Sequence, residues 1–351
     1  MVFRPFRSRA ARAAVAAAGV AALLATAGCA SSTTDAASTD GDELVELTLQ
    51  TSWIPLVQFG GSYIADAEGY YNEFGVDVDI LPGGPDVDPM AAVAAGQADI
   101  ALANADNVAR ANEQGADLVI IAAGFQKNPL AILSTPENPI NTPADMEGAK
   151  IGVPAGDEAA QKALEAYNGL DAEKITTVPV SFDVAPLVSG EVDGMWVFYT
   201  EQPISYEENT GVEGVTMLTA DYGYDIYAQV YVVTRDSLED DAKRAAIEGF
   251  LAGEIKGWQE YVADPALAVD LTVNDYAKDG GLTVENQTKQ AERQLALLVT
   301  PETEEHGLLW ISAEGIAKNI ETLDALGLPA DESIFDTSVL EAVYAGANTI
   351  K

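Results

Sequence analysis

The order of apolar and polar positions predicts strands and helices that alternate along the first half of the chain. The segments 44–50 and 76–80 alternate apolar with polar residues, as half-buried strands do. The segment 118–123 is continuously apolar, which is typical of a strand buried on both faces. Helical spacing over 61–68 and 104–114 falls between these strands. Strands that alternate with helices predict an α/β domain with a mostly parallel sheet.

The same alternation recurs further along the chain and predicts a second unit. Its predicted strands are 150–153, 175–180 and 195–198. The pattern at 93–100 returns at 187–194, and each copy reads as the apolar end of a helix, a glycine, one turn, an aspartate and a strand. Two such copies predict two lobes built on one plan. The apolar strands 131–134 and 231–234 bracket the second unit, and we interpret them as candidate crossovers between the lobes.

Beyond residue 234 the apolar spacing predicts mainly helices. The predicted helices are 242–262, 265–277, 284–299, 312–326 and 337–345. Asp264 followed by Pro265 is typical of a helix start, because proline is favoured at the first helical position. We therefore predict that residues 45–133 and 235–351 form lobe 1 and that residues 134–234 form lobe 2.

The first 28 residues have the pattern of a signal peptide. Four arginines without any acid precede an apolar run over 13–27, which is shorter than the ~20 residues that a spanning helix needs. The run ends in small residues before Cys29, and this ending resembles the bacterial lipobox, with Thr26 where leucine is usual. The resemblance implies lipidation at Cys29, export, and attachment to the outer face of the cell membrane. The alternative is a plain secretory signal. We predict that residues 29–43 form a flexible tether, because they lack large apolar side chains.

Composition narrows the classes of function. The chain carries 56 acidic and 18 basic side chains, for a formal net charge of −38, and loss of the four arginines of residues 1–28 would make it −42. Such a chain repels phosphate backbones, so we expect no nucleic-acid partner. One cysteine and one histidine exclude an internal disulfide and paired-histidine zinc motifs. We expect no metal, no cofactor and no catalytic residues. Neither a GxxxxGK phosphate loop nor a GxSxG elbow occurs.

Several stretches, in this order, resemble the NMT/THI-type solute-binding proteins of ABC importers. They are Trp53-Ile54-Pro55, 70–78, 82–85, 94–99, 145–153 and 190–193. The resemblance implies a type II periplasmic-binding-protein fold, with two α/β lobes, two crossovers and a ligand cleft that closes about a hinge. It also implies a monomer that delivers a small molecule to a separate permease and ATPase. A less favoured alternative is an enzyme, because the related pyrimidine synthases use this fold with a metal and a histidine.

The family contains binders of heteroaromatic molecules and binders of small anions. Trp53, Gln58-Phe59, the segment 82–85 and the segment 199–203 resemble the heteroaromatic binders, which take a thiamine pyrimidine precursor or riboflavin. Thr200 departs from the asparagine that this subgroup often has. The alternative is a binder of nitrate, a sulfonate or taurine, but such a site needs basic groups, and the predicted loops contain one lysine and no arginine.

Ligands of open α/β lobes meet the loops at the carboxyl ends of the strands, and this rule guides the choice of candidate contacts. The candidates are Trp53, Gln58, Phe59, Asn104, Asp106, Phe125, Gln126, Asp157, Glu158, Trp196, Tyr199, Glu201 and Asp225. Aromatic faces would stack on a flat ring, while amides and carboxylates would bind its nitrogens and amines. Glu201 is the preferred polar contact, since a carboxyl group can accept from an amine or, when protonated, donate to a ring nitrogen. Trp196 could equally be a core residue, and Asp157-Glu158 could be only a helix cap.

Overall fold

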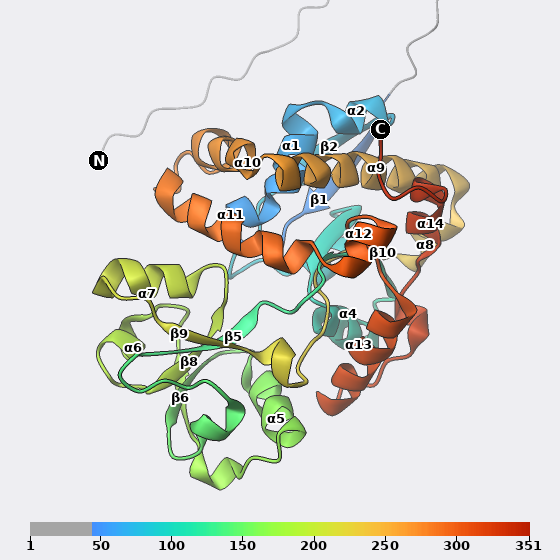
Figure 1. The fold of residues 1–351 in the computed structure, drawn as a ribbon. Coiled ribbons are helices and arrows are strands. Elements are labelled where there is room, and N and C mark those ends of the chain that lie inside the picture. Colours follow the sequence, from blue (N-terminus) through green and yellow to red (C-terminus); the bar gives the residue numbers. More distant parts are fainter. Residues whose placement is uncertain (1–43) are drawn as a thin grey trace, which may run out of the picture. The chain divides into compact units, whose positions relative to one another are not determined.

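The computed structural model describes residues 44–351, and within this range the chain forms two α/β lobes, each built around a five-stranded sheet (Figure 1). This architecture agrees with the predicted fold class. The signal peptide, the tether and Cys29 lie outside the described residues.

The sheet of lobe 1 has the strand order β2-β1-β3-β10-β4. Its strands are β1 (Val45–Gln50), β2 (Val76–Leu81), β3 (Ile100–Ala103), β4 (Leu118–Phe125) and β10 (Ala228–Thr234). The helical elements η1 (Val57–Phe59), α1 (Gly60–Ala67), α2 (Tyr70–Glu73), α3 (Pro89–Ala94) and α4 (Ala105–Glu113) connect the first strands. Because helices connect them, β1, β2 and β3 are parallel, whereas β10 is antiparallel to β3 and β4. Every residue of β4 is buried, as its apolar run predicts.

The sheet of lobe 2 has the strand order β7-β6-β8-β5-β9. Its strands are β5 (Leu130–Ser134), β6 (Lys150–Pro154), β7 (Thr176–Val180), β8 (Gly194–Phe198) and β9 (Val215–Leu218). Its helical elements are η2 (Pro143–Met146), α5 (Glu158–Tyr167), η3 (Ala172–Lys174), α6 (Ala185–Val188), α7 (Gln202–Thr210) and η4 (Thr219–Tyr222). The pattern of apolar residues did not predict α7 and β9, because α7 is mostly polar and β9 has only four residues.

The two copies of the repeated pattern have the same structure in the two lobes. The turn glycines, between α3 and β3 and between α6 and β8, have left-handed φ angles of 67° and 74°. In lobe 1, the Asp99 carboxylate accepts a hydrogen bond from the backbone N of Thr48 at 2.9 Å. In lobe 2, the Asp193 carboxylate accepts one from the backbone N of Lys150 at 2.8 Å. Each aspartate thus ties its turn to the start of the neighbouring strand, so the lobes share one plan.

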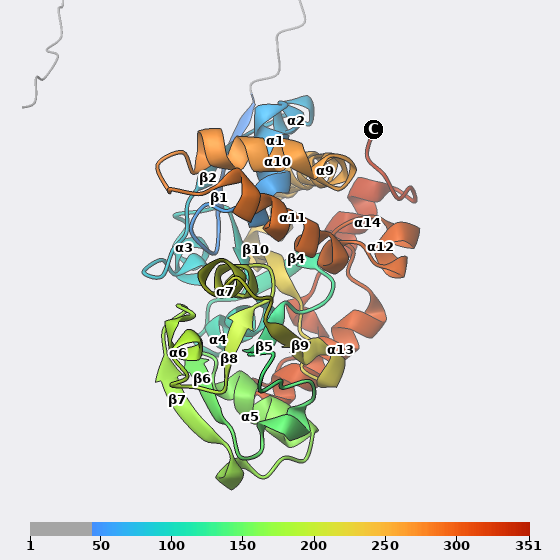
Figure 2. The ribbon, with the colours of Figure 1, turned by 60° about the vertical axis from the view of Figure 1, so that its left-hand side comes forward.

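The chain crosses between the lobes at 126–129 and 219–227 (Figure 2). β5 pairs with β8 and β9 in lobe 2, and β10 pairs with β3 and β4 in lobe 1. This corrects the predicted boundaries, which placed 131–133 in lobe 1 and 228–234 in lobe 2. An apolar run shows that a strand is buried but carries no information about which sheet it joins.

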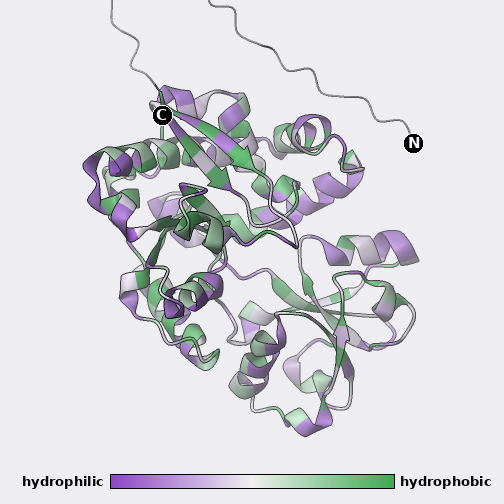
Figure 3. Cartoon of the chain, turned by 180° about the vertical axis from the view of Figure 1, so that it is seen from behind, coloured by the Kyte–Doolittle hydropathy of each residue, from purple (hydrophilic) through white to green (hydrophobic). Residues whose placement is uncertain are grey.

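After β10 the chain is helical and belongs to lobe 1. Hydrophilic and hydrophobic residues alternate along the helices of the molecule (Figure 3). The elements are α8 (Arg235–Glu239), α9 (Asp241–Ala263), α10 (Pro265–Leu271), η5 (Thr272–Tyr276), α11 (Val284–Leu298), α12 (Pro301–His306), α13 (Ala313–Ala325), η6 (Glu332–Ile334) and α14 (Ser338–Tyr344). The predicted helix 265–277 is divided, because its α-helical part ends at Leu271 and a π-helical turn follows.

Helices α1 and α9 approach each other closely, and glycines make this possible. A Cβ atom on Gly61 would lie 2.2 Å from the ring of Trp258, and one on Gly257 would lie 2.2 Å from the backbone oxygen of Gly61. Larger residues at these positions would force the helices apart.

A fully buried carboxylate, Glu254 of α9, lies in the same interface. Its oxygens accept hydrogen bonds from Ser62 Oγ at 2.6 Å, Tyr231 OH at 2.7 Å and Trp258 Nε1 at 2.9 Å, and from the hydroxyl of Tyr71. Burial raises the pKa of this carboxyl, and the hydrogen bonds from Ser62, Tyr231, Tyr71 and Trp258 oppose that rise. The four donors therefore offset the free-energy cost of burying this carboxyl group in the core of lobe 1.

Candidate ligand-binding site

A cavity of about 240 Å³ lies between the lobes, where the carboxyl ends of strands from both sheets meet. The loop after β1 and the start of α4 line it from lobe 1, and the loops after β6, β7 and β8 line it from lobe 2. Seven of the predicted contacts line this cavity: Trp53, Gln58, Asn104, Asp106, Asp157, Trp196 and Glu201. The fold therefore brings these residues, which are far apart in the sequence, to one place, as expected for loops at the carboxyl ends of strands.

Helix starts position the polar groups of the cavity. Asn104 is the N-cap of α4, and its backbone N donates to Asn107 Oδ1 at 3.1 Å, which fixes the first turn. Asp106 lies in that first turn. Asp157 and Glu201 occupy the N-cap positions of α5 and α7, yet neither side chain makes a capping hydrogen bond. Their carboxyl groups therefore remain available to a ligand in the cavity.

The surroundings of the carboxyl groups in the cavity disfavour their ionised form. Burial raises the pKa of Asp157 to about 7, and the nearby carboxylates of Asp106 and Glu158 add to this effect. Burial also raises the pKa of Asp106, while the guanidinium of Arg110, 3.8 Å away, opposes the rise. Burial likewise raises the pKa of Glu201, opposed by a hydrogen bond with Gln202. Near neutral pH, Asp157 can therefore either donate or accept a hydrogen bond.

Aromatic side chains from both lobes contribute the apolar part of the cavity. The rings of Trp53, from lobe 1, and Phe182, from lobe 2, are 5.6 Å apart and meet edge to face at 70°. Trp196 is fully buried and lies 6.2 Å from Tyr224 in a second edge-to-face pair. Its indole Nε1 donates to Gln161 Oε1 at 3.2 Å. Trp196 is thus both a core residue and a lining residue, which combines the two alternatives from the sequence.

Several residues that line the cavity were not among the predicted contacts. Phe182 follows the carboxyl end of β7, so the strand-end rule would have found it if applied to that strand. Tyr224 lies in the second crossover, a segment from which Asp225 was predicted as a contact instead. Arg110 lies one helical turn after Asp106. It is the only basic side chain that lines the cavity among residues 44–351.

Six of the predicted contacts do not line the cavity. Phe59 and Phe125 are fully buried in the core of lobe 1. Gln126 Nε2 donates to the backbone oxygens of Ala123 and Trp310, at 2.8 and 3.0 Å. The exposed Glu158 accepts from the backbone N of the nearby Gly156 at 2.9 Å. A strand-end position does not determine whether a side chain points to the cleft or to the core.

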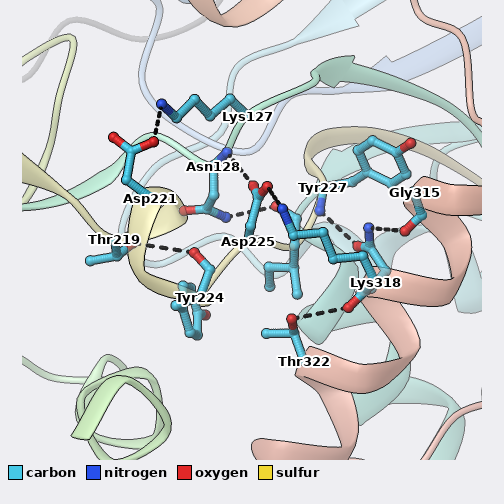
Figure 4. Close-up of polar contacts among 12 residues, drawn as sticks. Lys127, Asn128, Thr219, Asp221, Tyr224, Asp225, Tyr227, Gly315, Lys318 and Thr322 are labelled. Carbon is cyan, nitrogen blue, oxygen red and sulfur yellow. Dashed lines mark hydrogen bonds and ion pairs between the residues drawn. The ribbon is translucent and has the colours of Figure 1, made fainter. Parts of the chain in front are cut away.

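Tyr199 and Asp225 lie close to the cavity but make their contacts elsewhere. Tyr199 packs against Arg293 of α11, whose guanidinium carbon lies 5.3 Å from the centre of the ring. Asp225 lies in the second crossover, where Oδ1 accepts from the backbone N of Asn128 at 2.9 Å and Oδ2 pairs with Lys318 Nζ at 2.5 Å (Figure 4). Both therefore contribute to the connection between the lobes.

The hinge is further tied by Lys127 of the first crossover, whose Nζ lies 2.6 Å from Asp221 Oδ1 (Figure 4). Asn128 Nδ2 donates to the backbone oxygen of Ile226 at 2.8 Å, so the two crossovers are joined directly. Lys127 is thus engaged in an ion pair at the hinge and does not line the cavity.

Within the described range, no group of three or more histidine, cysteine, aspartate or glutamate side chains is arranged to hold a metal ion. No helix among residues 44–351 is long and apolar enough to span a membrane.

Two curated proteins resemble this chain over most of their length. A formylaminopyrimidine-binding protein of Halalkalibacterium halodurans is 27% identical over 262 residues, which cover 73% of this chain and 78% of that protein. The riboflavin-binding protein RibY of Chloroflexus aurantiacus is 24% identical over 299 residues, which cover 81% of this chain and 82% of that protein.

Solved structures of binding proteins share the fold. The periplasmic aliphatic sulphonate-binding protein SsuA of Escherichia coli has a TM-score of 0.64 and 17% identity, and the match covers 83% of this chain and 96% of SsuA. The periplasmic nitrate-binding protein NrtA of Synechocystis has a TM-score of 0.60 and 14% identity, covering 86% and 89%. These matches confirm the predicted periplasmic-binding-protein fold. The sequence from 57 to 268 matches the family described as NMT1/THI5 like, and the chain therefore belongs to that family.

Proposed function

We propose that this chain is the extracytoplasmic solute-binding protein of an ABC importer and that it captures a small heteroaromatic ligand of the thiamine-pyrimidine or flavin class. The observation that carries the proposal is the meeting of aromatic and carboxyl side chains from both lobes in one cavity. Trp53 and Phe182 offer ring faces and edges to a flat molecule, and Asp157 and Glu201 offer hydrogen-bonding groups to its nitrogens and amines.

The charge of the cavity favours such a ligand over an oxyanion. Three acidic side chains, Asp106, Asp157 and Glu201, line the cavity, and the single arginine there is close to Asp106. The starts of α4 and α5 could attract an anion through their backbone N–H groups, but both carry an aspartate at that point. A nitrate or sulfonate would therefore meet carboxyl groups where it needs positive charge.

The volume of the cavity favours a small ligand within this class. Pockets for drug-sized molecules span about 300–1,000 Å³, whereas this cavity measures about 240 Å³. A single pyrimidine ring with short substituents fits such a volume more readily than the three rings of a flavin. We therefore favour a pyrimidine over a flavin.

Capture by closure of the two lobes would deliver the ligand to a separate permease and ATPase. In this proposal the protein is a monomer, held at the outer face of the cell membrane by a lipid on Cys29. Binding without chemical conversion is supported by the position of His306. This histidine, the only one in the sequence, stacks on Trp310 and does not line the cavity.

Titration calorimetry with formylaminopyrimidine, riboflavin, nitrate and taurine tests this proposal. We expect formylaminopyrimidine to bind most tightly, and binding of nitrate or taurine alone would refute the heteroaromatic class. Trp53→Ala and Glu201→Ala should abolish detectable binding without unfolding the protein, since both side chains line the cavity. Trp310→Ala, which removes a tryptophan outside the cavity, is the matched control and should bind normally. Unchanged affinity in both cavity variants would refute the placement of the site.

A further inference from the structure

Helix α11 of lobe 1 contacts helix α7 of lobe 2 through polar side chains. Asn286 Nδ2 donates to Glu208 Oε1 at 2.9 Å, and Lys289 Nζ lies 3.4 Å from Glu207 Oε1. Positions 286 and 289 are three residues apart, so they lie on the same side of α11. These contacts join the lobes away from the two crossovers.

A third residue on that side of α11 reaches the turn that carries a cavity residue. Arg293 Nη1 donates to the backbone oxygen of Tyr199 at 3.1 Å, and its guanidinium lies over the Tyr199 ring. The backbone N of Tyr199 donates to the backbone oxygen of Pro129 in the first crossover at 2.8 Å. Glu201, two residues after Tyr199, lines the cavity. The turn that presents Glu201 is therefore held by lobe 1 and by the hinge together.

The distribution of charge makes this contact unusual for the chain. The sequence has 56 acidic and 18 basic residues, so two lobes with average surfaces repel each other. The Lys289 and Arg293 side chains both contact lobe 2, and they meet Glu207 and the oxygen of Tyr199. Two of the few basic side chains therefore lie at this contact, where they attract lobe 2.

We propose that Asn286, Lys289 and Arg293 form an inter-lobe strap that favours the closed cleft, and that Arg293 is a positioning residue that fixes Glu201 for the ligand. The ligand-affinity part of this inference rests on the proposed function. Separation of the lobes breaks all three contacts and releases the turn at Tyr199, so closure and the placement of Glu201 are coupled. A smaller population of the competent state lowers the apparent affinity in proportion.

Calorimetric titration with formylaminopyrimidine tests the positioning role. Arg293→Ala removes a charged donor and should weaken affinity roughly tenfold. Arg293→Lys keeps the charge but not the planar group over Tyr199, and it should restore only part of the loss. Arg244→Ala is the matched control, because Arg244 bonds Glu248 and Ser338 within lobe 1. It should lower the melting temperature without changing affinity. Wild-type affinity in Arg293→Ala, or an equal loss in Arg244→Ala, overturns the positioning role.

Small-angle X-ray scattering without ligand tests the strap independently of the ligand's identity. Lys289→Glu places an acid opposite Glu207 and should increase the radius of gyration, and the charge swap Lys289→Glu with Glu207→Lys should restore the wild-type value. If no probe molecule binds but scattering changes as expected, the proposed ligand class fails and the strap stands. Scattering that is identical in wild type, Lys289→Glu and Arg293→Ala overturns the strap.

Discussion

Replacing Asp157 with asparagine should stabilise the ligand-free protein above neutral pH, because its carboxyl group is unfavourable to ionise in the cavity. Burial, with the charges of Asp106 and Glu158, raises the pKa of Asp157 from 3.8 to about 7. The folded protein therefore retains a proton that the unfolded chain releases between these two values. Stability must fall as the pH rises through this interval and level off above it. Asparagine has nearly the same shape and cannot ionise, so the variant lacks this fall.

The size of the effect follows from the difference between the two pKa values. A pKa of about 7 instead of 3.8 corresponds to roughly 4 kcal/mol, and contact with solvent through the mouth of the cavity reduces this to about 2–4 kcal/mol at pH 8. Well below pH 3.8 this carboxyl is protonated in both the folded and the unfolded state, so the two proteins should have similar stability there. A binding site that destabilises its own protein in this way is expected where carboxyl groups must remain available to a ligand.

Urea unfolding of the wild type and Asp157→Asn at half-unit intervals from pH 4 to pH 8 measures the effect. The curves should diverge steadily with rising pH, with the variant more stable. Asp240→Asn is the matched control, because backbone hydrogen bonds from Lys243 and Ala242 lower the pKa of that exposed carboxyl, which lies outside the cavity. Its stabilising contribution is present at high pH and is lost on acidification, so its removal should not stabilise the protein at pH 8. Parallel curves for the wild type and Asp157→Asn would refute the reasoning.

Three further substitutions test the core and the hinge. Glu254→Ala removes the acceptor of the buried hydroxyls of Ser62, Tyr71 and Tyr231, whereas Trp258 Nε1 still donates to the Tyr231 hydroxyl, and the variant should lose at least ~3 kcal/mol of stability in urea unfolding. A loss below 1 kcal/mol would contradict the role of this carboxylate. Gly61→Ala places a methyl group 2.2 Å from the ring of Trp258 and should lower stability by about 1–3 kcal/mol in the same assay, whereas a neutral result would show that α1 and α9 adjust freely. Asp225→Asn keeps an acceptor for the Asn128 backbone but weakens the ion pair to Lys318, so amide hydrogen exchange at 126–129 and 219–227 should accelerate. Unchanged exchange there would show that this ion pair does not restrain the hinge.

Local patterns in the sequence predicted most of the strands and helices, because burial imposes a periodicity that differs between the two. The continuous apolar run of β4 and the glycine-turn-aspartate repeat before β3 and β8 are read correctly from sequence alone. Short polar elements such as α7 and β9 lack this periodicity, and their stability comes from the contacts that they make in the folded protein.

The candidate site, too, could be predicted from the sequence only in part. The strand-end rule located Trp53, Asp157 and Glu201 at one cavity, since parallel strands direct their carboxyl ends to a common edge. It also selected Phe59 and Phe125, which point into the core, because the rule specifies a position along the chain and not a side-chain direction.

The sequence by itself determined the fold class, the two-lobe plan and the family, because these depend on periodic burial and on motifs that are local in the chain. Only the tertiary structure decided that β5 and β10 belong to opposite sheets and that Phe182 of lobe 2 meets Trp53 of lobe 1. It alone placed Arg293 against the turn that carries Glu201. Each of these pairings joins segments distant in sequence, and such contacts are selected by the packing of the whole molecule, which no local pattern records.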